Sequence, residues 1–328
     1  MRKYIVKRLL ISIFLLFFVA LIIYSIMRSI PTSYVEAIAR ERATQPNSKS
    51  YSEWLAQLNQ IYGLDRGILP GFFMWLKNAV RGDFGDSWLF TVPVTQKFAE
   101  VIWYSFTLGA VAFVLELIIA IPLGILSARK QYSRTDYTIT VVALLGISLP
   151  TFFFATILKL VFSIRLDLLP LFGIVGRFHE QLDSFGKLLD MGKHMILPVM
   201  TLVIISIGGL MRYTRTNMLE VLNSDYIRTA RAKGLSENRV INYHAFRNTL
   251  IPIVTIVGGS LPGLFAGALI TETLFQIPGI GYTSYQAMVS GDIPFSMFYL
   301  VFMAALTLLG TLIADILYAV VDPRVRVS

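Results

Sequence analysis

Residues 225–252 read Asp225-Tyr-Ile-Arg-Thr-Ala-Arg-Ala-Lys-Gly234-Leu-Ser-Glu-Asn-Arg-Val-Ile-Asn-Tyr-His244-Ala-Phe-Arg-Asn-Thr-Leu-Ile-Pro252. This stretch is polar and basic, yet it lies between two long apolar segments. Its first part predicts a short helix over residues 226–233, because Gly234 supplies the left-handed conformation that commonly ends a helix. Residues with oxygens that can cap this helix come just before it: Asn223, Ser224 and Asp225.

The second part of the stretch predicts another helix. Ser236 can cap its start and Glu237 lies favourably in its first turn, after which the helix runs through Val240 and Phe246. A helix of about eight residues, such as 226–233, is not stable alone in water because nucleation is unfavourable. We therefore expect it to pack against this protein's own membrane domain or against a partner.

The composition is that of a protein in a lipid environment. Of its 328 residues, 55% are hydrophobic and 15% are charged, whereas globular domains carry about 25% charged residues. The deficit of charge indicates an integral membrane protein. The chain has no cysteine, which excludes disulfides and cysteine-based metal sites or nucleophiles.

Six apolar segments are long enough to cross a bilayer as helices. They lie at about 9–27, 101–127, 137–164, 194–210, 250–275 and 295–320. The first segment is longer than the apolar region of a typical signal peptide, and no small-residue cleavage site follows it. The sequence therefore predicts an all-α integral membrane protein with six transmembrane helices. We expect Pro122 and Pro150 to kink the second and third helices.

The distribution of charge predicts the orientation in the membrane. The segments assigned to the cytoplasm hold 16 of the 29 Lys and Arg residues and five acidic residues, whereas the external segments hold twelve of each sign. This asymmetry follows the positive-inside rule and places both termini in the cytoplasm of a multi-pass cell-membrane protein. Membrane topology thus explains the net charge of +9. The positive charge therefore does not indicate a nucleic-acid partner, and we expect none.

The segment between the first two spans, residues 28–100, is too long for an ordinary loop and predicts a small external subdomain. We divide the chain into a cytoplasmic N-terminus with the first helix, 1–27, this subdomain, and a core of five helices, 101–328. The core contains the basic cytoplasmic loop 212–249.

Charged residues within the predicted spans are Glu116, Lys159, Glu272 and Asp315. Ionisable groups inside a bilayer usually face a bundle interior or a water-filled cavity. Glu116, near mid-membrane, and Glu272 are candidates for lining a translocation path, and internal hydrogen bonding of Glu116 is an equal alternative. We expect Lys159 to extend to the lipid headgroups. Asp315 has either a functional role or a structural one, paired with a loop arginine.

The fifth span contains Gly259, Gly263 and Gly267, which are spaced four residues apart. On a continuous helix they share one face and allow another helix to approach closely. This partner helix belongs either to the same subunit or to a second one.

Motifs for enzymatic chemistry are weak. The sequence has no Gly-x-x-x-x-Gly-Lys-Ser/Thr motif, so we expect no nucleotide bound through a P-loop in this chain. The run from His179 to Asp183 differs from His-Glu-x-x-His in its second ligand, and Ser260 lacks the glycine of a nucleophile elbow. His194 and His244 are isolated in the sequence, so we predict no catalytic residue and no metal site.

The run 225–235, together with the stretch 244–248 and Pro252, resembles the cytoplasmic EAA loop of ABC importer permeases. Its form is that of the dipeptide/oligopeptide subgroup. Arg228 stands where the family usually has Glu, and Thr229 replaces the first Ala. The peptide subgroup shares both departures.

Three other stretches fit this resemblance. Residues 28–100 resemble the external region of the B-type permease subunit of the peptide subgroup. Two stretches resemble the family's later segments. They are 272–281, which reads Glu-Thr-Leu-Phe-Gln-Ile-Pro-Gly-Ile-Gly, and the closing Asp322-Pro-Arg.

The resemblance implies a type I ABC importer permease fold and a defined set of partners. A homologous second permease completes the path, an external solute-binding protein delivers peptides or a similar small solute, and two cytoplasmic P-loop ATPases bind ATP and Mg. This chain then holds no cofactor. The short helix becomes the coupling helix, and the residues implied to contact an ATPase are Tyr226, Arg228, Thr229, Ala230, Ala232, Lys233, Gly234 and Leu235.

Three other interpretations compete with this one. Residues 225–252 could be an ordinary basic cytoplasmic loop. The chain could be an ion-coupled secondary transporter that uses Glu116, although no inverted repeat of broken helices stands out. An intramembrane hydrolase would require His179 or Ser260 to act, without a credible set of catalytic partners.

Overall fold

The computed structural model describes residues 2–29, 33–46, 48–61 and 63–321. These residues form helices and turns, with a single isolated bridge between Asp86 and Pro93 in the described part of the chain. The all-α prediction is confirmed. The segment Asp322-Pro-Arg lies outside the described residues.

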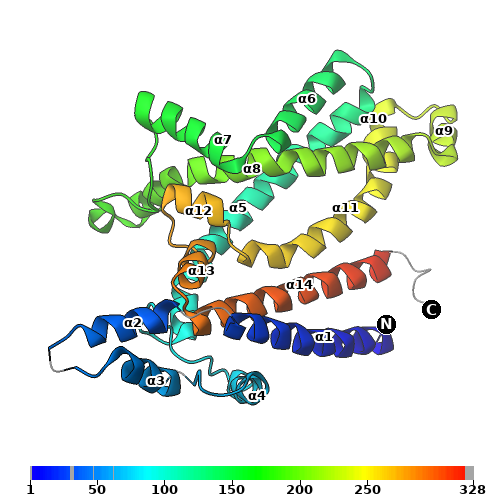
Figure 1. The fold of residues 1–328 in the computed structure, drawn as a ribbon. Coiled ribbons are helices and arrows are strands. Elements are labelled where there is room, and N and C mark those ends of the chain that lie inside the picture. The colour runs from blue at the N-terminus through cyan, green and yellow to red at the C-terminus, as the bar shows by residue number, and fades with distance from the viewer. Residues whose placement is uncertain (1, 30–32, 47, 62, 322–328) are drawn as a thin grey trace. The chain divides into compact units, whose positions relative to one another are not determined.

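The helical elements are labelled in chain order in Figure 1. They are α1 (Arg2–Ser29), α2 (Ser33–Ala43), α3 (Tyr51–Ile61), α4 (Ile68–Ala79), α5 (Val94–Arg129), α6 (Arg134–Ser148), α7 (Thr151–Leu158), η1 (Lys159–Arg165), η2 (His179–Gln181), α8 (Ser184–Leu222), α9 (Asp225–Ala232), α10 (Glu237–Arg239), η3 (Val240–Ala245), α11 (Phe246–Ser260), η4 (Leu261–Phe265), α12 (Leu269–Phe275), α13 (Ile280–Val289) and α14 (Ile293–Val321). Contacts divide the chain into two compact units: residues 1–103 with 280–309, and residues 104–279 with 310–328.

Four helices in the described part of the chain are long and apolar enough to cross a membrane by themselves. They lie within Ile5–Ala43, α5, α8 and α14. Two bent helix pairs raise the number to six if each pair is one span. The predicted six segments are therefore present, and two of them are broken.

The first broken span bends by 104° between α6 and α7. Pro150 lies at this break, where its ring and missing N–H disfavour a continuous helix. The sequence predicted a kink at this residue, and the structure shows a sharper change of direction. Pro122, by contrast, is contained within the single helix α5.

The second broken span bends by 49° between Glu237–Leu250 and Pro252–Phe265. Further interruptions follow, which correct the prediction of one continuous helix over 250–275. The α-helix α11 ends at Ser260 and is followed by the 3₁₀ turn η4, and Gly267 adopts a positive φ of 81° before α12 begins. Because the helix is interrupted, Gly259, Gly263 and Gly267 do not share one helix face, and that prediction is wrong.

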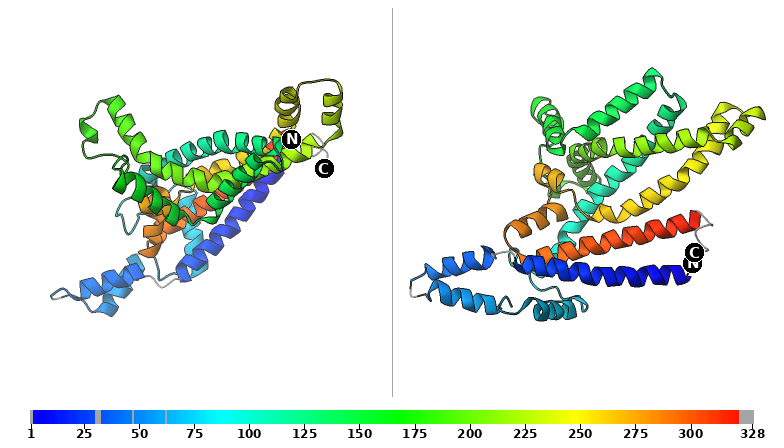
Figure 2. Two further views of the ribbon diagram at one scale, coloured as in Figure 1. Left: turned by 90° about the horizontal axis from the view of Figure 1, so that it is seen from above. Right: turned by 45° about the vertical axis from the view of Figure 1, so that its right-hand side comes forward.

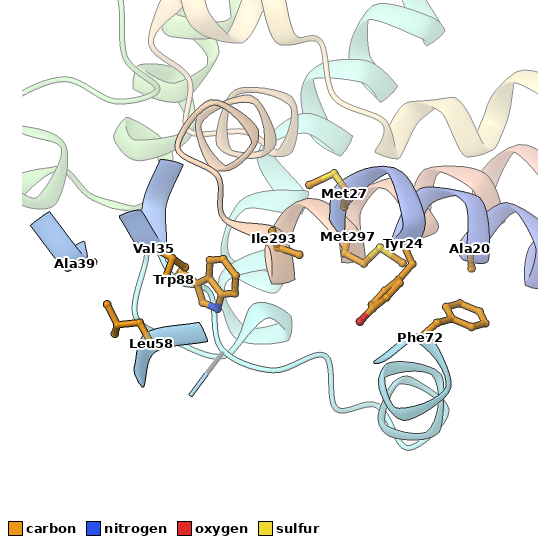
Figure 3. Close-up of a cluster of buried hydrophobic side chains, with 10 residues drawn as sticks. All are labelled: Ala20, Tyr24, Met27, Val35, Ala39, Leu58, Phe72, Trp88, Ile293 and Met297. Carbon is orange, nitrogen blue, oxygen red and sulfur yellow. The ribbon is translucent and has the colours of Figure 1, made fainter. Parts of the chain in front are cut away.

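The first unit includes residues 28–100, which contain the helices α2, α3 and α4. Helices α2, α3 and α4 surround a core with α1 and the start of α14. Figure 3 shows this core, in which Tyr24 and Phe72 contact edge to face at one end and Trp88 lies beside Val35 at the other. In Figures 1 and 2, α1 runs beside the first part of α14.

Asp292 closes this unit at the start of α14. Its carboxylate accepts hydrogen bonds from the hydroxyl of Ser87, from the backbone N–H of Leu89 at 3.1 Å and from that of Phe295 at 3.1 Å. The residue is fully buried. A carboxylate at a helix N-terminus satisfies otherwise unpaired N–H groups and interacts favourably with the helix dipole.

In the second unit, α6 packs closely against α8. A Cβ atom added at Gly208 would lie 2.5 Å from the carbonyl oxygen of Ala143, and one added at Gly146 would lie 2.5 Å from that of Ile204. The two backbones can approach this closely only because both positions are glycine.

Candidate functional site

The short helix α9 lies at the end of α8, and the loop that carries it projects beyond that end in Figure 2. It spans Asp225–Ala232, one residue earlier at each end than predicted. Gly234 follows with φ of 75°, as predicted, and the N–H of Leu235 donates to the carbonyl of Ala230 at 3.4 Å. The glycine therefore ends α9 in the left-handed conformation.

The cap of α9 differs from the prediction. Ser224 occupies the N-cap position, but its hydroxyl donates to the carbonyl of Val221 at 2.6 Å and makes no capping bond. Asp225 is already helical, and its carboxylate accepts a bond from Arg228 at 3.4 Å. Ser236 is likewise the N-cap residue of α10 without a side-chain capping bond.

One face of α9 packs against this chain. Ile227 is fully buried and Ala230 is 7% exposed. Their neighbours in this apolar cluster come from the ends of α5 and α8 and from η3: Ala128, Met218, Val240, Ile241 and Ala245. The membrane unit itself thus supplies part of the packing that a short helix requires.

The other face of α9 is open. Tyr226 is 48% exposed. Of the eight predicted coupling residues, six are exposed: Tyr226, Arg228, Thr229, Ala232, Lys233 and Gly234. Leu235 is half-buried and Ala230 is buried, so these two residues support the helix from inside.

An ion pair joins α9 to the helix that follows. The guanidinium of Arg231 donates to the two carboxylate oxygens of Glu237 at 2.8 Å and 3.1 Å. This hydrogen bonding raises the pKa of Arg231 above its ordinary value. Both side chains are more than 40% exposed, so water screens the pair and its net contribution is about 0–1 kcal/mol.

The chain after α9 continues as a nearly unbroken helical run of α10, η3 and α11. The segment Val240–Ala245 is a π-helix, a widened turn often found at functional sites. It contributes three buried residues, Val240, Ile241 and Ala245, to the α9 cluster. His244 contacts the ring of Tyr243 edge to face and its carbonyl accepts a bond from Asn248 at 2.7 Å.

A buried ion pair lies nearby in α6 and α8, and the sequence did not single it out. Arg215 donates from Nε to Asp136 at 2.9 Å and from Nη2 at 2.8 Å. The Asp136 carboxylate also accepts bonds from the hydroxyl of Ser127 and from the N–H of Tyr132 at 2.9 Å. The pair ties the turn between α5 and α6 to α8 at Arg215, ten residues before α9 begins.

The two acidic residues predicted to line a path have different surroundings. Glu116 is half-buried in α5 and lies near the side chain of Ser206 in α8. Glu272 is fully buried in α12, where its carboxylate accepts bonds from the hydroxyl of Ser105 at 2.6 Å and the N–H of Ala268 at 2.9 Å.

Lys159 was predicted to extend to the lipid headgroups, but its side chain bonds within the protein instead. Its ammonium donates to the carbonyl of Leu274 at 2.6 Å and lies 5.4 Å from the ring centre of Phe275. A hydrogen bond to a free carbonyl at the end of α12 satisfies both groups.

The structure also corrects the view that His194 is isolated. His179 Nδ1 lies 2.7 Å from a carboxylate oxygen of Asp190, and His194 Nδ1 lies 2.8 Å from the backbone carbonyl of the same residue. The N–H of Gly176 donates to that carboxylate at 2.8 Å. Within the described residues no group of three or more potential ligands has an arrangement suited to a metal ion.

Comparison with known proteins places this geometry in a family. Residues 120–327 match the family described as binding-protein-dependent transport system inner membrane component. The matched region includes α9 and its supporting cluster.

Relatives match over nearly the whole chain. The oligopeptide transport system permease protein AppB of Bacillus subtilis is 38% identical over 99% of this chain and 100% of its own length. The corresponding OppB of Haemophilus influenzae is 35% identical with the same coverage, and the dipeptide transport system permease protein DppB of Escherichia coli is 34% identical over 99% of each chain. The family match and these relatives agree with the resemblance seen in the EAA-like stretch, and this chain belongs to the binding-protein-dependent transport system inner membrane components, the multi-pass permease subunits of ABC importers.

Proposed function

We propose that this chain is the B-type permease subunit of an importer for dipeptides or oligopeptides. The names of the relatives support the substrate class, and the match over 99% of this chain includes the segment 28–100. The permease forms one half of a translocation path, a homologous permease forms the other half, and an external binding protein delivers the solute.

The amphipathic helix α9 is the observation that supports coupling most directly. Its inner face is held by Ile227 and Ala230 and its outer face presents Tyr226 and Arg228. Such a helix is firmly attached to the permease and still offers a surface to an ATPase. ATP and Mg bind to two such ATPase subunits, and movement of their docking surfaces pushes α9.

The attachment of α9 defines how this movement reaches the membrane helices. Ile227 and Ala230 share a cluster with Ala128 at the end of α5 and Met218 near the end of α8. A push on α9 is therefore transmitted to both helices, which rotate between inward-facing and outward-facing states. In this arrangement both termini lie in the cytoplasm, and Glu116 and Glu272 lie along or beside the path.

The test separates docking from folding by changing the two faces of α9 in turn. We expect Arg228→Glu to reduce co-purification of the ATPases and ATP-driven peptide uptake without changing thermal unfolding of the permease, because its side chain is exposed. Ala230→Asp places a carboxylate in the apolar cluster and should lower both coupling and thermal stability.

A matched control is Arg239→Glu, which makes the same charge change at another exposed residue of this loop, outside α9. Undiminished ATPase association and uptake in Arg228→Glu and in Tyr226→Ala would contradict the assignment of α9 as the coupling helix. Transport by the chain reconstituted alone, driven by an ion gradient, would contradict the importer itself.

A further inference from the structure

Helix α4 differs from α2 and α3, the two other helices of the segment 28–100, in the residues that it leaves exposed. Its sequence, Ile-Leu-Pro-Gly-Phe-Phe-Met-Trp-Leu-Lys-Asn-Ala, contains one charged residue, Lys77. Leu69 and Phe73 are 57% and 56% exposed, and a spacing of four residues places them on one face of the helix. The exposed residues of α2 and α3 are mostly polar or small, for example Arg40 and Glu53. Contiguous exposed apolar surface marks a contact with another protein or with a membrane.

The opposite face of α4 packs on α1. Phe72 is fully buried, and its ring centre lies 5.7 Å from that of Tyr24 and 5.5 Å from that of Phe17. A Cβ atom added at Gly71 would collide with the hydroxyl of Tyr24, so the two helices approach closely. Figure 3 shows Tyr24 and Phe72 on the facing sides of α1 and α4. These contacts fix the level of α4 along α1.

The position of the contact along α1 gives its depth in the membrane. The segment 9–27 of α1 has no charged residue and is bounded by Arg8 and Arg28. A helix over these nineteen residues is about 28 Å long, which matches a hydrocarbon core of about 30 Å. Phe17 lies eleven residues before Arg28, or about 16 Å along the helix. It is therefore near the middle of the core.

The exposed Phe73 lies close to this depth, because its ring centre is 6.5 Å from that of Phe17. The loop before α4 lies higher, at the charged end of α1. There, the guanidinium of Arg28 donates to the carbonyls of Leu64 and Arg66, each at 2.9 Å. In Figure 1, α4 is seen nearly end-on while α1 lies across the picture. Helix α4 thus starts near the polar boundary and runs across α1 inside the apolar layer.

The surface next to Phe73 favours lipid acyl chains as its neighbours. Helix α1, a candidate membrane span, presents exposed apolar side chains at the same depth, including Phe14 and Phe18. The rings of Phe17 and Phe18 contact each other edge to face, so the exposed side of α4 is continuous with this surface of the span. Lys77 is exposed, and its long stem allows the ammonium to reach the headgroups.

We propose that α4 is embedded in the leaflet that surrounds the C-terminal half of α1, where Leu69 and Phe73 contact acyl chains. This helix anchors α2 and α3 at the membrane surface, as an amphipathic helix does when its apolar face enters the boundary between headgroups and acyl chains. The segment 28–100 is then partly a membrane element and not wholly external. The proposal does not depend on which solute the importer carries.

The test measures which molecules reach α4 in the full chain reconstituted into phosphatidylcholine vesicles. The chain has no cysteine, so Phe73→Cys and Leu69→Cys each carry a nitroxide label at one position. Molecular oxygen concentrates in hydrocarbon and a nickel chelate stays in water, and both speed the relaxation of a nitroxide that they reach. Phe18→Cys on α1 is the lipid reference and Ser52→Cys on α3 is the water reference, both at exposed positions. We expect positions 69 and 73 to match position 18, with an oxygen-to-nickel accessibility ratio several-fold above that at position 52.

Crosslinking in native membranes tests the neighbour of α4 directly. The photoreactive residue p-benzoylphenylalanine in place of Phe73 should form adducts with phospholipid on irradiation, as it should in place of Phe18. Because these side chains are exposed, the variants should fold, and thermal unfolding checks this. Nickel accessibility at positions 69 and 73 equal to that at position 52 would overturn the proposed depth. Crosslinking of position 73 to another protein, and not to phospholipid, would overturn the assignment of lipid as its neighbour.

Discussion

Two turns in the second unit are each fastened by an arginine–carboxylate pair, yet their surroundings differ. The α5–α6 turn is fastened by Asp136 and Arg215, whose side chains are 4% and 23% exposed. The α9–α10 turn is fastened by Arg231 and Glu237, which are 43% and 47% exposed. Both pairs have their shortest contact at 2.8 Å.

The comparison shows that distance alone does not rank ion pairs. Breaking a buried pair leaves an uncompensated charge in a low-dielectric environment, whereas water solvates the remaining partner of an exposed pair. The α5–α6 turn is therefore a rigid attachment to α8, and the α9–α10 turn is an adjustable one. This difference suits a coupling loop in which α9 must move with a partner while the α5–α6 turn stays attached to α8.

The largest expected effect breaks the buried pair. Arg215→Met leaves the carboxylate of Asp136 buried without its counter-charge and should destabilise the second unit by about 3–5 kcal/mol. A lower thermal unfolding midpoint in detergent would show it. Asp136→Asn is the control, because the 23% exposed Arg215 regains water, and its effect should be smaller. Equal stability of Arg215→Met and the unchanged protein would show that the pair is not sequestered from water.

A smaller effect tests the packing next to this pair. Gly208→Ala places a Cβ atom 2.5 Å from the carbonyl of Ala143 and forces α6 and α8 apart. Overpacking of this kind costs about 1–3 kcal/mol. The matched change Gly209→Ala meets no atom within 4 Å and should not lower the unfolding midpoint. If both variants behave alike, the close approach of α6 and α8 is not required.

The third test concerns Gly234 at the end of α9, where an added side chain would strain the backbone conformation without contacting neighbouring atoms. Gly234→Ala meets no neighbouring atom but must adopt φ of 75°, which costs roughly 1–2 kcal/mol for a residue with a Cβ. We expect local loosening of α9, seen as faster amide exchange in residues 225–235, with little change in global unfolding. Gly234→Asn should be milder, since asparagine tolerates this conformation. Unchanged exchange in the alanine variant would contradict the requirement for glycine.

The smallest effect is expected from the exposed pair. Glu237→Gln removes the charge from the partner of Arg231 and should change stability by less than about 1 kcal/mol. Any effect should shrink further in high salt because exposed charges are screened. Thermal unfolding at low and high salt measures this. A loss as large as that of Arg215→Met would remove the distinction between the two turns.

The segments fixed by local signals could be predicted from the sequence. The C-terminal end of α9 follows from Gly234, and the long apolar runs appear as α1, α5, α8 and α14. Family membership was also available, because the EAA-like stretch is continuous along the chain. These features depend on neighbours a few residues apart, for which propensity and hydrophobicity are sufficient.

Only the tertiary structure determined the contacts between residues distant in sequence. Asp136 and Arg215 are 79 positions apart and Ser87 and Asp292 are 205 apart, so composition and spacing gave no sign that either pair is in contact. The same limit explains the missed link of His179 to Asp190 and the interrupted fifth span. A charged side chain acquires its partner only when packing brings two helices together and removes water, and no local pattern in the sequence encodes that event.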